Sequence, residues 1–95
     1  MSQENETSAL LQERKSVHGD WDKQSHIAFK LKKVLRSGVS FELELLTPSQ
    51  QEAIEMICVK ISRIACGDPN HADHWDDILG YAQLGKKGHE HDDSI

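Results

Sequence analysis

The sequence contains no apolar run that approaches the roughly 20 residues of a membrane-spanning helix. Its first ten residues, MSQENETSAL, are polar and lack the apolar segment of a secretory signal peptide. Cysteine is scarce, and Cys58 and Cys66 form no C-x-x-C motif, so the sequence implies buried free thiols and no disulfide framework. These absences predict a cytoplasmic protein with no membrane partner.

Basic residues are in the minority, with 11 Lys and Arg against 16 Asp and Glu and a net charge of -5. This balance argues against broad binding to DNA or RNA, which needs a basic surface. It is compatible with a free nucleotide, whose phosphates can be held by a metal ion and a few local cations. Neither a Ser/His/Asp nucleophile motif nor a glycine-rich phosphate loop is visible.

The chain has 95 residues, which is the size of one domain. A chain this short buries only roughly 60–65% of its unfolded surface, so we expect a homo-oligomer, a dimer or tetramer, to complete the core. The composition predicts a disordered N-terminus over 1–7, one helical domain over 8–84 and a disordered polar tail over 85–95.

Apolar residues recur at three- and four-residue spacing, which predicts helices over about 8–18 and 20–37. Residues 39–46, VSFELELL, alternate between apolar and polar as a strand does, but the sequence offers no partner strand. We therefore expect an extended connector that is partly helical. Pairing with the same segment of another chain would restore the strand interpretation.

The clearest helix start is Thr47-Pro48-Ser49-Gln50, which has an N-cap Thr, a Pro at the first helical position and a Gln completing a capping box. Gly67 ends this helix, and a turn leads to a last helix that reaches about Leu84. A short turn predicts that the two helices pack antiparallel. The expected fold is an all-α bundle of three to four helices, completed by oligomerisation.

Carboxylates on these two helices are the candidate metal ligands. They are spaced three or four residues apart, which places pairs on one helical face, and they comprise Glu52, Glu55, Asp73, Asp76 and Asp77. Carboxylates from two facing helices can chelate Mg²⁺ (or Mn²⁺), and such an ion can activate a water and neutralise charge on a phosphoryl group. A solvated acidic face is the alternative explanation.

Lys60 and Arg63 are the candidate phosphate contacts, since Arg offers a planar fork of donors. Trp75 and Tyr81 flank the acids and could stack on a base, and packing in the core is the alternative explanation. His18 could bind phosphate or base, or could simply complement a helix C-terminus. Gly80 costs about 1 kcal/mol relative to Ala in mid-helix, which suggests that something approaches its face closely.

Four histidines near aspartates suggest transition-metal affinity of an adventitious kind, namely His71, His74, His89 and His91.

The spacing Glu52-x-x-Glu55 followed by Asp73-x-x-Asp76 resembles the metal-binding pattern of the all-α MazG-like nucleotide pyrophosphohydrolases, which is E-x-x-E and then E-x-x-D. The third acid here is Asp instead of Glu, and the family's doubled glutamate is absent. A second likeness, to small phage proteins of the MazG-like and nucleotide-modification-associated kind, spans roughly residues 13–84. It rests on Glu13-Arg14, His18-Gly19-Asp20, KISRI at 60–64, Gly67-Asp68 and DHWDDILGYA at 73–82.

The resemblance makes Lys60, Arg63, Asp73 and Asp77 the better site candidates, and it implies phage nucleotide metabolism in the host cytoplasm with a deoxynucleoside triphosphate as ligand. Two hypotheses follow from it. One is a Mg²⁺-dependent hydrolase that converts a nucleoside triphosphate to monophosphate and pyrophosphate. The other is a catalytically inactive module that binds a nucleotide or a host protein.

Overall fold

The computed structural model describes the backbone of residues 2–92 and the side chains of residues 7–88. Over this range the fold is all-α and contains no strand, as the sequence predicted. Where three or four helices were expected there are five, because a one-turn helix lies in the predicted connector. They are α1 (Ser2–His18), α2 (Trp21–Arg36), α3 (Val39–Glu42), α4 (Pro48–Cys66) and α5 (Ala72–Asp92).

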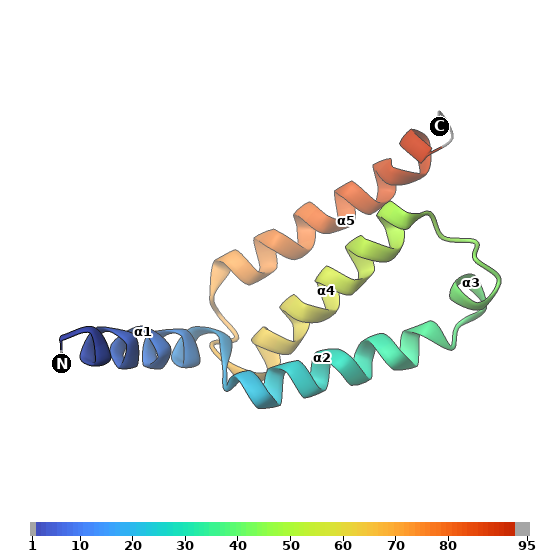
Figure 1. Cartoon of the computed structure of the whole chain (residues 1–95). Coiled ribbons are helices and arrows are strands. Elements are labelled where there is room, and N and C mark those ends of the chain that lie inside the picture. The colour runs from blue at the N-terminus through green and yellow to red at the C-terminus, as the bar shows by residue number, and fades with distance from the viewer. Residues whose placement is uncertain (1, 93–95) are drawn as a thin grey trace.

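The central helix is α4, which packs between α2 and α5 and runs antiparallel to both (Figure 1). The α4–α5 pair confirms the antiparallel packing expected from the short turn. Helix α1 projects away from this layer and meets it only near its C-terminal end (Figure 1). The molecule is therefore elongated, with extents of 53 × 26 × 25 Å.

The start of α4 forms the predicted capping box. The Thr47 hydroxyl accepts a hydrogen bond from the Gln50 backbone N–H (3.1 Å), and the Gln50 side-chain oxygen accepts one from the Thr47 N–H (3.0 Å). Two backbone donors that the helix cannot satisfy are thus paired. Gly67 caps the other end of α4, and the Asp68 carboxylate accepts from the Asn70 N–H in the turn that follows.

Residues 39–46 form the partly helical connector that the sequence predicted. The single turn α3 is followed by Leu43 and Glu44, and Glu44 has a φ of 55°, so the chain reverses instead of extending. The alternation of apolar and polar residues therefore does not produce a strand here.

Both outer helices are longer than expected. Helix α1 begins at Ser2, within the segment 1–7 predicted to be disordered, and α5 continues to Asp92, through most of the predicted tail 85–95. In α5 the reason is close packing: a Cβ on Gly85 would lie 3.1 Å from the Ala53 Cβ, and one on Gly88 would lie 2.5 Å from the Ser49 Cβ. Glycine thus lets the end of α5 approach the start of α4. Residues 1 and 93–95 of the predicted segments lie outside the described residues.

The buried face of α5 differs from the side on which its large apolar residues recur. That side contains Trp75, Ile78 and Leu79, but Trp75 and Leu79 are 52% and 67% exposed. The face toward α4 is a stripe at helical spacing that includes His74, Tyr81, Gly85 and Gly88. Two glycines, a tyrosine and a histidine form this stripe, so hydrophobicity alone pointed to the neighbouring one.

The core of the single chain is small, since Ala28, Ala53 and Cys58 are the hydrophobic residues that the described part buries fully. An apolar groove of about 430 Å³ stays open between α2 and α4, and its apolar lining is Ile27, Leu31, Val34, Leu35, Cys58 and Ile61. Among the described residues, no helix combines the length and the apolar character needed to cross a membrane.

Candidate functional site

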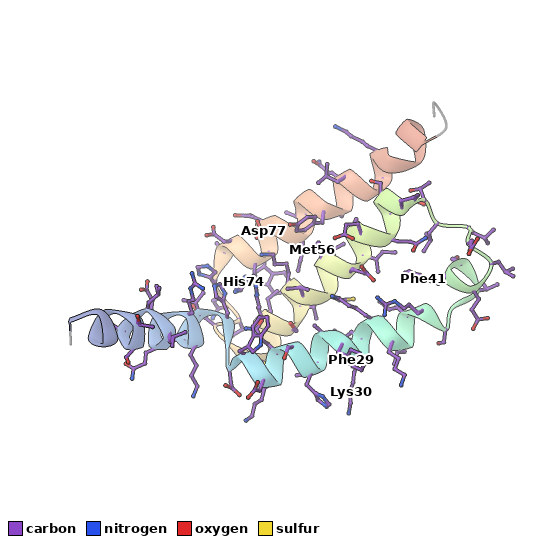
Figure 2. The ribbon with its side chains drawn as sticks, in the orientation of Figure 1. Phe29, Lys30, Phe41, Met56, His74 and Asp77 are labelled. Carbon is purple, nitrogen blue, oxygen red and sulfur yellow. The ribbon has the colours of Figure 1, made fainter. Side chains whose placement is uncertain are left out.

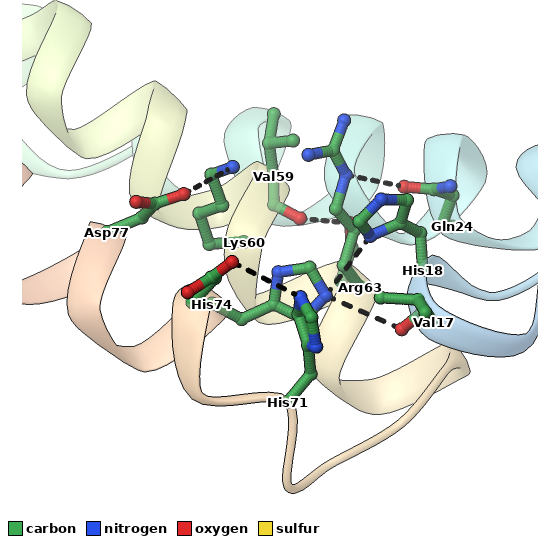
Figure 3. A network of polar contacts seen from close by, with 11 residues as sticks. Val17, His18, Gln24, Val59, Lys60, Arg63, His71, His74 and Asp77 are labelled. Carbon is green, nitrogen blue, oxygen red and sulfur yellow. Dashed lines mark hydrogen bonds and ion pairs between the residues drawn. The ribbon is translucent and has the colours of Figure 1, made fainter. Parts of the chain in front are cut away.

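Three parts of the chain meet where α1 ends: the α1–α2 link, the end of α4 and the first turn of α5. Gly19 has a φ of +88°, and a Cβ there would lie 2.5 Å from the Cys66 Cβ, so only glycine fits. The Asp68 N–H donates to the Val17 carbonyl at 2.9 Å, which ties the α4–α5 turn to α1. This crossing brings together polar side chains that are far apart in sequence. We call them the junction site, which comprises His18, Gln24, Lys60, Arg63, His71, His74 and Asp77 (Figure 3).

His74 lies at the centre of the junction site and is 1% exposed. Its Nε2 lies 3.2 Å from Nδ1 of His18 and 3.4 Å from the Val17 carbonyl oxygen (Figure 3). A carbonyl oxygen only accepts, so Nε2 of His74 carries the hydrogen and Nδ1 of His18 is an acceptor. The remaining hydrogen of a neutral His18 is then on Nε2. The ring of His71 packs edge-on against the His74 ring, with centroids 4.7 Å apart.

Both His18 and His74 are held neutral. Burial lowers the pKa of His18, and Arg63, His74, His71 and Lys60 add positive potential that lowers it further. Burial also lowers the pKa of His74, which the hydrogen bond to the Val17 carbonyl partly offsets. At neutral pH the pair is therefore a donor–acceptor unit and not two cations.

Asp77 lies on α5, the helix that also carries His74 (Figure 2). Lys60 joins α4 to α5 through an ion pair with Asp77, with 2.8 Å between Nζ and Oδ2 (Figure 3). The Lys60 side chain is 12% exposed, whereas that of Asp77 is 46% exposed. The hydrogen bond from Lys60 lowers the pKa of the Asp77 carboxyl, so this aspartate is ionised. A mostly buried ammonium thus has one half-exposed carboxylate as its partner.

Arg63, one turn further along α4, points toward α2. Its Nε donates to the side-chain oxygen of Gln24 at 3.2 Å (Figure 3). Gln24 is only 5% exposed, and it orients the guanidinium. Arg63 forms no ion pair with any residue that the structure describes, so the two terminal amino groups of its fork remain available. Arg63 and His18 also line a cavity beside the junction site.

The predicted carboxylates separate into two groups. Asp77 is in the junction site, and Asp73 lies near it, with an 80% exposed side chain 3.7 Å from Nε2 of His71. Asp76 is exposed. Glu55 instead pairs with Arg36 on α2, and Glu52 is exposed. Within the described part of the chain, no group of three or more His, Cys, Asp and Glu residues is arranged to hold a metal ion.

The two predicted base-stacking residues lie apart. The Trp75 indole donates to the Pro69 carbonyl at 2.9 Å, beside the turn. Tyr81 lies two helical turns further along α5 and lines a separate groove with Ile54 and Gly85. A Cβ on Gly80 would meet no atom within 4 Å among the residues that the structure describes. The close approach that its presence suggested therefore does not come from the described part of the chain. The side chains of His89 and His91 are outside the described residues.

One family model, described as a domain of unknown function (DUF6378), matches residues 4–89. The chain belongs to this DUF6378 family. No curated protein and no solved structure matches it. The DUF6378 match covers the complete junction site, all of α4, and α5 as far as residue 89.

Sequence reasoning did not assign a site role to Gln24 or a buried position to His74. Gln24 shares the helical spacing of Ile27, Ala28 and Leu31, and a polar residue in this otherwise apolar stripe of α2 was the available signal. His74 lacked such a signal, because its burial depends on where α1 ends, and periodicity within one helix does not report on that.

Proposed function

We propose that this protein binds a nucleoside triphosphate at the junction site, with Lys60, Arg63 and His18 as phosphate or base contacts. The observation that carries the proposal is the unpaired fork of Arg63, oriented by buried Gln24 and lying on the same helix as the Lys60–Asp77 pair. Arginine held in one orientation, with free terminal donors, suits the oxygens of a phosphate. The resemblance to phage MazG-like proteins adds the substrate class, a deoxynucleoside triphosphate.

The geometry favours binding that does not require a metal ion. The Asp77 carboxylate is already paired with the Lys60 ammonium at 2.8 Å, so a divalent ion would have to displace Lys60 to use that oxygen. Of the other candidates, Glu52 and Glu55 lie elsewhere on α4, with Glu55 bound to Arg36, and Asp73 and Asp76 are exposed on α5. Lys60 can supply the positive charge that a metal ion would otherwise bring to the phosphates.

The second candidate is hydrolysis of the triphosphate to monophosphate and pyrophosphate with Mg²⁺ or Mn²⁺. It is favoured by the four-residue spacing of Asp73 and Asp77, which places both carboxylates on one face of α5. Mg²⁺ typically uses one or two carboxylates together with substrate phosphates, so these two residues would hold it. The ion would activate a water for attack.

One experiment separates the two candidates. The folded protein is incubated with each deoxynucleoside triphosphate and Mg²⁺ or Mn²⁺, pyrophosphate release is measured, and melting is followed with nucleotide in EDTA. We expect nucleotide to raise the melting temperature in EDTA. The Arg63→Gln variant, which keeps Arg14 and the other surface cations, should lose this rise. Metal-dependent pyrophosphate release that Asp77→Asn abolishes and Asp22→Asn preserves would establish the hydrolase instead. Neither stabilisation nor turnover with any nucleotide would refute both candidates.

The proposed assembly is a homo-oligomer formed through the apolar groove between α2 and α4. Val34 and Leu35, on its rim, are 68% and 42% exposed. A second copy is the fitting occupant because the single chain buries few hydrophobic residues. Such a fold needs a permanent partner that buries more apolar surface, and a transient partner would not stabilise it.

A further inference from the structure

A cavity of about 460 Å³ lies beside the junction site, bounded by the last turns of α1, the α1–α2 link, the start of α2 and Arg63 of α4. Its volume is within the range of small-molecule sites. None of the carboxylates and aromatic residues that the sequence singled out lines this cavity. Its walls contain Arg14, Lys15, Trp21 and Gln24, which had no predicted function.

The charge of the cavity is positive on a protein that is acidic overall. The lining contains three cationic side chains, Arg14, Lys15 and Arg63, and a single carboxylate, Asp20. None of these three cations forms an ion pair with a residue that the structure describes. Unpaired cations that surround a concave space concentrate small anions there.

Two further features point to a ligand and not only to a basic surface. Gln24 is only 5% exposed. Its side-chain oxygen accepts a hydrogen bond from Arg63, and its amide NH₂ has no partner among the described residues. A buried amide donor without an acceptor costs free energy, which a ligand oxygen or ring nitrogen would recover. The Trp21 indole, 67% exposed, forms part of the wall and offers a flat apolar face.

We propose that this cavity holds the nucleotide, with the phosphates on Arg14, Lys15 and Arg63 and the base against Trp21. This inference rests on the proposed function and specifies where that ligand lies. The combination of cations and an indole selects a phosphate ester that carries an aromatic ring, because inorganic phosphates would leave the indole unused. The Gln24 amide donates to an acceptor of the bound nucleotide, and Arg63 connects the cavity to the junction site.

The test measures dissociation constants by calorimetry in EDTA for four deoxynucleoside triphosphates and for inorganic tripolyphosphate. The double variant Arg14→Gln/Lys15→Gln should weaken binding of both ligand types at least tenfold. The matched control, Lys23→Gln/Lys33→Gln, makes the same change of charge at exposed positions outside the cavity and should change affinity less than twofold. Trp21→Leu should weaken the nucleotides severalfold and leave tripolyphosphate unchanged. All of these positions are exposed, so circular dichroism should show an intact fold.

The outcomes distinguish the inference from the proposed function. Equal losses of affinity in the double variant and in its control would overturn the cavity assignment. The proposed function would still hold in that case if nucleotide binding required Arg63. If tripolyphosphate binds as tightly as the nucleotides and its binding needs Arg14 and Lys15, the base contact of Trp21 and the assignment of a nucleotide as the ligand would both be overturned. No binding of any nucleotide by the unaltered protein would refute the proposed function as well.

Discussion

Replacing Gly88 by Ala should destabilise the protein, whereas replacing Gly80 by Ala, two turns earlier in the same helix, should stabilise it. Both changes gain the same intrinsic helix propensity, about 1 kcal/mol. They differ in what the new methyl group meets. At Gly80 it has open space, but at Gly88 it would lie 2.5 Å from the Ser49 Cβ. The Ser49 hydroxyl can rotate away, but its Cβ is fixed to the backbone of α4.

Overpacking of this kind typically costs about 1–3 kcal/mol, so the two variants should differ by about 2 kcal/mol in the free energy of unfolding. For a domain of this size that corresponds to a difference of about 8–16 °C in Tm. Thermal unfolding followed by circular dichroism at one protein concentration measures it, since association makes Tm depend on concentration.

Equal stabilisation by both alanines would refute the packing of the α5 end against α4 and would restore the prediction of a polar tail after Leu84. A loss of stability in Gly80→Ala would have a different meaning. It would indicate that a second copy of the chain approaches the open side of α5, because none of the described residues lies there.

Two more predictions concern protonation and assembly. The folded protein keeps His18 and His74 below their ordinary pKa of 6.5, so the unfolded chain binds more protons, and the free energy of unfolding should fall as pH decreases from about 7.5 to 5.5. Urea unfolding should show this fall, and His74→Gln should flatten it; a pH-independent stability would contradict the neutral pair. The double variant Val34→Ser/Leu35→Ser should convert the oligomer to monomer in light scattering, whereas Val39→Ser, at an exposed position outside the groove, should not. A monomer already present in the unaltered protein would refute self-association through this groove.

Local signals in the sequence predicted local structure well. The capping box at Thr47 and the glycine at position 67 fixed both ends of α4, because caps act through atoms within a few residues. The antiparallel pairing of α4 and α5 followed from the shortness of their turn. The alternation in 39–46 was correctly set aside, since a strand without a partner leaves its backbone unsatisfied and the chain instead forms one helical turn.

The same local patterns did not predict the packing between elements that are far apart in the sequence. The last helix was expected to end at about Leu84 because the segment that follows is polar, yet α5 continues to Asp92. Gly85 and Gly88 let this part of α5 approach α4, because α4 fills the space that a side chain would occupy. Glu52 and Glu55 were grouped with the aspartates by spacing, but spacing within α4 does not show which neighbour each residue faces, and Glu55 faces α2. Of the predicted site residues, the structure brings Lys60, Arg63, His18 and Asp77 close together, while Trp75 and Tyr81 lie elsewhere.

The distribution of charge makes a protein that is acidic overall compatible with the proposed anionic ligand. An extended polyanion such as DNA would have to lie along many turns of a surface on which the acids outnumber the bases, and each added contact would meet further carboxylates. A mononucleotide needs only one small region. Three cations and one carboxylate line the cavity at the end of α1, and the neighbouring histidines are kept neutral by burial. A net charge of -5 disfavours an extended polyanion, whereas the proposed nucleotide would meet mainly the cations of the cavity. Raising ionic strength should weaken its binding only as far as the exposed Arg14 and Lys15 contribute.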